Sequence, residues 1–225
     1  MVHVGDADAF VAGVTYHYPD VIRPALQVVG VAPGVSKVAG LYLILKGGKV
    51  YLFADPTVNI EPTAEDLADI AIMAADRAMT FHLTPRVAMI SFSTFGSTRH
   101  PLSEKVRHAV ELVRTRRPDI TVDGEMMVDV ALSPALSEAD YPFSAVKGEA
   151  NVLIFPDLEA ANVAYKLMQH LGGATVIGPI LMGMGRSIHV LPRGAEVTEI
   201  IDMAALAVVD AQLIEWRPQR AAAGD

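Results

Sequence analysis

The stretch Asn151-Val152-Leu153-Ile154-Phe155-Pro156-Asp157 decides the fold class, because it is typical of a short buried strand that ends at a turn. Leu158–Leu171 follows with the apolar spacing of a helix, and the apolar segment Thr175–Leu181 predicts the next strand. A strand, a helix and a strand in this order indicate a parallel pair joined by a crossover helix. The sequence therefore predicts an α/β fold, with mostly parallel sheets that carry helices on both faces.

Segments on either side of this unit continue the alternation. Gly47-Gly48 separates the β-prone runs Lys37–Leu45 and Lys49–Ala54, which predicts a hairpin. In Thr63–Met79 a capping threonine is followed by an acid at helical spacing, and apolar residues then recur with the period of a helix. The remaining predictions are the strands Arg86–Phe92 and Ser187–Leu191, the helices Ser103–Thr115 and Glu196–Trp216, and a frayed tail over Arg220–Asp225.

The composition argues against several classes of function. The 225 residues carry a formal net charge of −8, so the overall field repels nucleic acid and anionic membranes, and neither is expected as a partner. The chain has no cysteine, which removes disulfides and thiolate metal sites, and we expect no metal. No apolar run is long enough to span a membrane and the first residues lack a signal-peptide pattern, so a cytoplasmic protein is expected.

Common catalytic motifs are missing from the sequence. It contains no phosphate loop, no His-Glu-x-x-His zinc helix and no Gly-x-Ser-x-Gly nucleophile elbow. Gly183-Met184-Gly185 follows a predicted strand but lacks the third glycine of a dinucleotide-binding loop. The 7 histidines lie far apart, and the closest pair, His100 and His108, does not have the spacing of a metal-binding pair on a helix. We therefore interpret them as surface or core residues.

The segment Ser91-Phe92-Ser93-Thr94-Phe95-Gly96-Ser97, called the Ser91–Ser97 segment below, places hydroxyl groups and a glycine at the carboxyl end of a predicted buried strand. Ligands bind at this edge of open α/β sheets, and hydroxyls with free backbone N–H groups can hold phosphate or pantetheine oxygens. An ordinary loop with turn and capping residues would have the same composition. On the residues alone, both interpretations stay open.

A series of motifs runs through nearly the whole chain. Those upstream are Gly5-Asp6-Ala7-Asp8, Arg23-Pro24-Ala25-Leu26-Gln27, Phe53-Ala54-Asp55, Pro62-Thr63-Ala64-Glu65-Asp66-Leu67-Ala68 and the Ser91–Ser97 segment. Those downstream are Asn151–Asp157, Tyr165-Lys166-Leu167, Gly172-Gly173-Ala174, Gly178-Pro179-Ile180-Leu181-Met182-Gly183 and Leu191-Pro192-Arg193-Gly194. In this order the motifs resemble those of the phosphate acetyl/butyryl-transferase family.

The resemblance implies two α/β subdomains around a cleft, as in the isocitrate and isopropylmalate dehydrogenases, in a protein that forms homo-oligomers. Coenzyme A and acyl phosphate meet in that cleft, and no cofactor is covalently bound. Domains of this family begin well before the position that matches Met1, so the first subdomain is expected to lack its N-terminal portion. On this basis residues 1–30 belong to the first subdomain, 31–182 form the second, and 183–225 return to the first with a C-terminal helix.

The resemblance also implies the residues of the site. The family has a serine–arginine pair before a glycine and an aspartate on the next helix, which this chain matches with Pro192, Arg193 and Glu199. Proline offers neither a hydroxyl nor an N–H, and the loss of one such donor typically costs about 100- to 1,000-fold in rate, so Arg193 and Glu199 are expected to be vestigial as catalytic residues. Glu199 can equally be an acid that only stabilises a helix start. The expected ligand-binding residues are Arg23, Ser93, Thr94, Gly178, Pro179, Met182 and Arg193.

Other residues differ from the common pattern of the family, and these differences indicate which members the chain resembles most. Phe95 replaces a lysine that is common there, and Val14-Thr15-Tyr16-His17-Tyr18-Pro19 replaces a turn that contains histidine and threonine. Together with Tyr141-Pro142-Phe143 they resemble the C-terminal domain of large bacterial NADP-dependent malic enzymes, which senses acetyl-coenzyme A. The resemblance thus predicts a regulatory domain that binds acetyl-coenzyme A or another acyl-coenzyme A beside a malic-enzyme catalytic domain. The alternatives are an active phosphate acyltransferase and a structural dimerisation module.

Overall fold

The computed structural model describes residues 1–223, with side chains as far as Ile214, and divides the chain into two compact units. The larger unit is Ala39–Val176, and the smaller unit combines Met1–Val38 with Ile177–Asp225. The boundaries expected from the sequence lay instead between residues 30 and 31 and between residues 182 and 183. Both divisions make the smaller unit from the two ends of the chain.

The larger unit is built on a sheet in which the strands follow the order β5-β4-β6-β3-β2. β2 and β3 form an antiparallel hairpin, whereas β3 with β6, β6 with β4, and β4 with β5 are parallel pairs. The strands are β2 (Ala39–Lys46), β3 (Lys49–Ala54), β4 (Arg86–Ile90), β5 (Thr121–Met126), β6 (Val152–Ile154) and β7 (Thr175–Met182), of which the last continues into the smaller unit. The predicted hairpin and the predicted mostly parallel sheet are confirmed.

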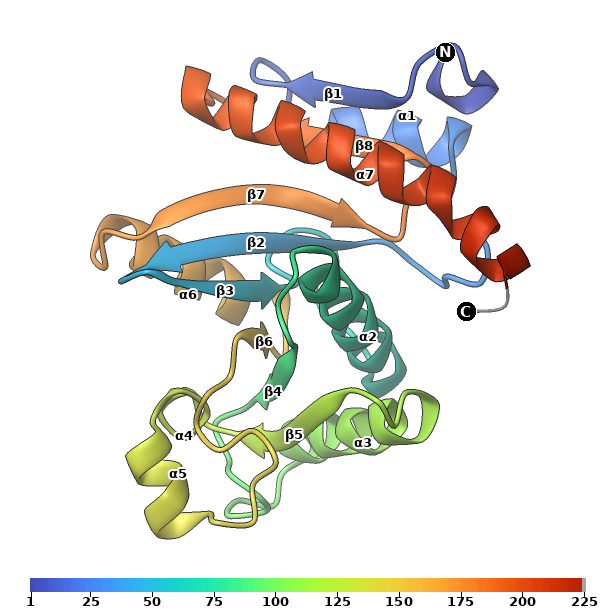
Figure 1. Ribbon diagram of the computed structural model, residues 1–225. Helices are drawn as coiled ribbons and strands as arrows, with labels where there is room; N and C mark the ends of the chain where they lie inside the picture. The colour runs from blue at the N-terminus through green and yellow to red at the C-terminus, as the bar shows by residue number, and fades with distance from the viewer. Residues whose placement is uncertain (224–225) are drawn as a thin grey trace. The chain divides into compact units, whose positions relative to one another are not determined.

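Helices cover both faces of this sheet (Figure 1). α2 and α3 pack against the strands and against each other, and α6 packs against β2 and β3. One face forms an apolar core in which Phe53, Leu153 and Phe155 meet residues of α4 and α6. The helices are α2 (Ala64–Thr80), α3 (Pro101–Arg116), α4 (Val128–Leu132), α5 (Pro134–Asp140) and α6 (Leu158–His170).

α2 shows why the local pattern of the sequence predicts this structure. The Thr63 hydroxyl accepts the Asp66 N–H at 3.2 Å, and the Asp66 carboxylate accepts the Thr63 N–H at 3.0 Å, which is the reciprocal cap expected at a helix start. Ala71, Ala74 and Ala75 in the following turns are fully buried, and their small side chains let the helix lie close to its neighbours. The predicted helix Thr63–Met79 is therefore confirmed to within one residue at each end.

The smaller unit contains the parallel pair β1 (Ala9–Gly13) and β8 (Ser187–Leu191). α7 (Val197–Ala223) lies along β8 and β1, and α1 (Tyr18–Val28) contacts the same strands (Figure 1). A short 3₁₀ helix, η1 (Val2–Val4), precedes β1. Since α7 extends to Ala223, the expected frayed tail is wrong for Arg220–Ala223, and its last two residues lie outside the described part of the chain. Among the described residues, no helix is long and apolar enough to cross a membrane.

Candidate functional site

Strands β1 and β8 end at the same edge of the smaller unit. Gly13 closes β1, Leu191 closes β8, and the two residues are partners in the parallel register. After β1 the chain reaches His17, the cap of α1, and after β8 it passes through Pro192 and Arg193 to the start of α7. The carboxyl edge of parallel strands is where ligands bind in α/β sheets, and helix starts carry partial positive charge. This edge is the candidate site of the smaller unit.

Backbone contacts hold the two loops of this edge together. A Cβ added at Gly13, whose φ is +133°, would lie 2.2 Å from the Leu191 carbonyl oxygen, so only glycine fits. The Thr15 N–H donates to the Gly13 carbonyl at 2.8 Å around Val14, which has a φ of 67°. A three-residue turn of this kind is rare, and positive φ is unusual for a β-branched residue. The Gly194 N–H then donates to the Val14 carbonyl at 3.0 Å, which joins the loops.

Two side chains meet on the outside of these loops. Nη1 of Arg193 lies 3.4 Å from Nε2 of His17, and both side chains are exposed. A guanidinium group only donates, so the imidazole nitrogen accepts in this contact. Sequence reasoning identified Arg193 but placed His17 among the scattered histidines. The structure brings them together although they stand 176 positions apart.

The other predicted site residues of the smaller unit have different surroundings. The Glu199 carboxylate accepts the Glu196 N–H at 2.8 Å, which is the helix-start contact that the sequence left as an alternative. Arg23 is exposed on α1, whereas Met182 is buried at the end of β7. Gly178 and Pro179 lie within β7 and are joined by a cis peptide bond.

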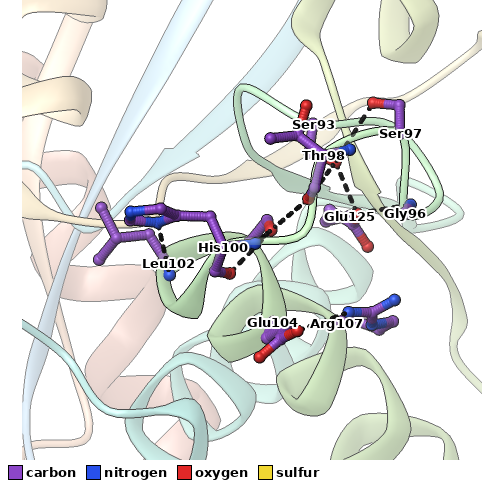
Figure 2. Close-up of polar contacts among 10 residues, drawn as sticks. Ser93, Gly96, Ser97, Thr98, His100, Leu102, Glu104, Arg107 and Glu125 are labelled. Atoms are coloured by element: carbon purple, nitrogen blue, oxygen red, sulfur yellow. Dashed lines mark hydrogen bonds and ion pairs between the residues drawn. The ribbon is translucent and has the colours of Figure 1, made fainter.

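In the larger unit, the hydroxyls of the Ser91–Ser97 segment are engaged within the protein. Figure 2 shows the Ser93 hydroxyl, which donates to Oε1 of Glu125 at 2.9 Å, and the Gly96 N–H, which donates to the same oxygen at 2.7 Å. The Thr94 hydroxyl accepts the Met127 N–H at 3.0 Å. Ser93, Thr94 and Glu125 are all buried. These contacts fix the loop, and the predicted ligand-binding role of Ser93 and Thr94 stays a prediction.

Glu125 is a buried acid that sequence reasoning missed. It lies in β5, and the only signal was an acidic residue next to a glycine inside an apolar context. Its Oε2 has no hydrogen-bond partner among the described residues. An unmatched buried carboxylate oxygen is costly, so the two hydrogen bonds to Oε1 matter for keeping the side chain in place.

Asp55 is a second buried acid, and it belongs to one of the motifs that carry the resemblance. Oδ1 accepts the N–H groups of Gly40, Thr57 and Val58 at 2.9 to 3.1 Å, and Oδ2 accepts the N–H of Asn59 at 3.0 Å. Burial raises the pKa of Asp55, and the hydrogen bonds to its carboxylate act in the opposite direction. The side chain fixes the turn after β3 and is explained without a ligand.

The structure also brings together the residues that set this chain apart from the common family pattern. The ring of Phe95 lies 5.5 Å from that of Tyr141 and 4.9 Å from that of Phe143, measured between centroids. Phe143 is exposed at the outside of this cluster. Phe95 and the Tyr141–Phe143 stretch are therefore parts of one packing arrangement in the larger unit.

The predicted site residues fall on both units. Ser93 and Thr94 belong to the larger unit, and the smaller unit holds Arg23, Gly178, Pro179, Met182, Arg193 and Glu199. Within the smaller unit, the observed link is between Arg193 and His17, at the carboxyl edge of β1 and β8. That all predicted residues line one cleft stays a prediction.

Comparison with known proteins identifies the family. A family model described as "Phosphate acetyl/butaryl transferase" matches residues 1–208. The chain belongs to this family. A phosphate acetyltransferase of Bacillus subtilis is 41% identical over 211 residues, which are 94% of this chain and 65% of the relative. A phosphate acetyltransferase of Thermoanaerobacterium thermosaccharolyticum is 45% identical over 219 residues, which are 94% of this chain and 67% of that relative.

A solved structure confirms the fold of this family member. The crystal structure of a phosphotransacetylase from Streptococcus pyogenes matches with a TM-score of 0.89 at 41% identity and covers 95% of this chain and 65% of that one. The chain thus spans about two thirds of the length of these relatives. They are named phosphate acetyltransferase or phosphotransacetylase, so they support the acyltransferase alternative and do not support the predicted malic-enzyme link. Homo-oligomer formation and cytoplasmic location stay predictions.

Proposed function

We propose that this chain transfers an acyl group between an acyl phosphate and coenzyme A. In the forward direction the thiol sulfur bonds to the carbonyl carbon, and the bond from that carbon to the phosphate oxygen breaks. The thiol proton is lost to a base, and the products are acyl-coenzyme A and inorganic phosphate. Membership of the phosphate acetyl/butyryl-transferase family over residues 1–208 carries this proposal.

The edge formed by Gly13, His17 and Arg193 offers a place for the phosphate group. A guanidinium presents a planar set of donors that matches phosphate oxygens, and the Arg193 side chain is exposed at this edge. The starts of α1 and α7 follow the same two strands, and their backbone dipoles also favour an anion. Negative charge on the phosphate grows as the carbon–oxygen bond breaks, so a cation here stabilises the transition state.

Coenzyme A carries phosphates of its own, and Arg23 is the predicted partner for one of them. It is exposed on α1, the helix that follows His17. Because Pro192 supplies no hydrogen-bond donor, we expect slower transfer than in a relative with serine at this position.

Product formation by the full chain tests this function. Acetyl phosphate and coenzyme A are supplied, and acetyl-coenzyme A is measured by mass spectrometry, followed by the reverse reaction from acetyl-coenzyme A and phosphate. We expect both directions to run, and Arg193→Ala to remove most of the rate in each. If the wild type forms no more product than the heat-denatured chain, transfer is excluded.

A second candidate is a domain that binds acyl-coenzyme A without transferring the acyl group. Pro192 favours it, and so does the Glu199 carboxylate, because its contact with the Glu196 N–H engages it at the helix start. Titration calorimetry with acetyl-coenzyme A separates the two functions. Binding with no turnover supports the second candidate, whereas binding with turnover supports the first.

A further inference from the structure

His17 stands at a helix start but does not serve as an ordinary cap. Serine, threonine, aspartate and asparagine at this position usually accept an N–H of the first turn with the side chain. The His17 side chain makes no such hydrogen bond, and its Nε2 instead lies 3.4 Å from Nη1 of Arg193. The ring is therefore turned toward the arginine that follows β8.

No carboxylate of the described residues forms an ion pair with the Arg193 or His17 side chain. A protonated imidazole at this distance would repel the guanidinium. A dianion bound by both side chains would turn that repulsion into two attractive contacts, and charge-assisted hydrogen bonds are the stronger kind. The edge at the ends of β1 and β8 is where such an anion would bind.

We infer that His17 is a second phosphate-binding residue, which closes on the anion together with Arg193 when its imidazole is protonated. This inference rests on the proposed function, because the anion is the phosphate group of acyl phosphate or free phosphate. The protonated imidazole of His17 supplies a hydrogen-bond donor at an edge where Pro192 offers none. Phosphate binding should then strengthen as the pH falls.

The two helices that follow this edge carry few other ionisable groups near their starts. On α1 these are Asp20 and Arg23, and at the start of α7 they are Glu196 and Glu199, with Tyr16 and Tyr18 in the turn itself. Carboxylates, phenols and guanidinium groups ordinarily keep their charge between about pH 5.5 and 8.5, whereas histidine changes charge there.

Sulfate is the probe that tests the inference, since it keeps two negative charges throughout this range while phosphate does not. Its affinity for the full chain is measured by calorimetry at several pH values. For the wild type we expect the affinity for sulfate to be about tenfold higher at pH 5.5 than at pH 8.5. This is the change in affinity expected from one charge-assisted hydrogen bond. His17→Gln should bind weakly at every pH, and His17→Arg should bind tightly at every pH. His3→Gln, at an exposed histidine of η1, is the matched control and should behave as the wild type.

The outcomes separate this inference from the proposed function. If His17→Gln keeps the wild-type pH dependence, His17 does not bind the anion, and the inference is wrong. If Arg193→Ala also leaves sulfate affinity unchanged, the whole edge is not the phosphate site, and the proposed function loses its site as well. A variant that cannot fold is recognised by its circular dichroism spectrum, and His17→Arg then decides the question.

Discussion

The loop after β4 in the larger unit and the loops after β1 and β8 in the smaller unit both follow the carboxyl ends of parallel strands. In the first, Ser93 and Thr94 are buried and bonded to Glu125 and Met127. In the second, Arg193 is exposed beside a histidine. The hydroxyls of the first loop are buried and take part in hydrogen bonds within the protein, whereas the guanidinium of the second is open to solvent. We infer from this contrast that the carboxyl edge of β1 and β8 with Arg193, called the arginine edge below, is the place for an anion, while the ligand-binding role of Ser93 and Thr94 stays a prediction.

Gly13→Ala is expected to have the largest effect, because it breaks the edge of the smaller unit. The added Cβ would lie 2.2 Å from the Leu191 carbonyl oxygen at a φ of +133°. Overpacking and an unfavourable backbone angle each cost on the order of 1–3 kcal/mol, so we expect about 3 kcal/mol less stability in chemical denaturation. Gly5→Ala is the control, since nothing lies within 4 Å of its added Cβ. Equal losses in the two variants would contradict the close approach of β1 and β8.

Glu125→Ala tests the same comparison at the loop after β4 in the larger unit. It leaves the Gly96 N–H without its acceptor and removes the shorter hydrogen bond of the Ser93 hydroxyl, which also lies 3.3 Å from the Thr98 carbonyl oxygen; a buried unsatisfied group costs roughly 1–3 kcal/mol. We expect about 2 kcal/mol less stability by chemical denaturation and unchanged sulfate affinity at the arginine edge. A loss of sulfate affinity in protein that is still folded would mean that the Glu125 loop also serves the anion.

Pro192→Ser is expected to have a smaller effect, and in the opposite direction. It restores the hydroxyl and the backbone N–H that the family has before the arginine. We expect the initial rate of acetyl-coenzyme A formation to rise by about tenfold, which is less than the full value of a preorganised donor because the surrounding loop is adapted to proline. Pro118→Ser, at an exposed residue of the turn before β5, is the control for replacing a proline by serine elsewhere. An unchanged rate would show that the absence of a serine hydroxyl at position 192 is not the cause of slow transfer.

Local patterns predicted much of the fold, and long-range contacts explain the rest. The β2–β3 hairpin and α2 follow from a glycine pair and a helix cap, which act over a few residues. β5 was missed because Asp123 and Glu125 interrupt its apolar pattern. Both acids are buried and have partners that are distant in sequence: the Ala145 N–H donates to Oδ2 of Asp123 at 2.8 Å, and Ser93 donates to Glu125. α1 was missed because it contains Pro24, which is uncommon inside a helix.

The candidate site was predicted in part for the same reason. Arg193 lies in a motif that can be recognised along the chain. His17 joins it only through the parallel pairing of β1 with β8, and β1 itself was not predicted. Ser93 is hydrogen-bonded to Glu125, and no local pattern connects these two residues, which are 32 positions apart.

A side-by-side rate measurement tests most directly the claim that the arginine edge performs the chemistry. The initial rate of acetyl-coenzyme A formation is measured for Arg193→Ala and for Ser93→Ala at equal amounts of folded protein. Arg186→Ala is the control, because this exposed arginine precedes β8 at its opposite end. We expect Arg193→Ala to lose at least about 100-fold in rate, as for other charge-stabilising donors, and the other two variants to stay near wild type. A loss in Ser93→Ala with full activity in Arg193→Ala would contradict the account.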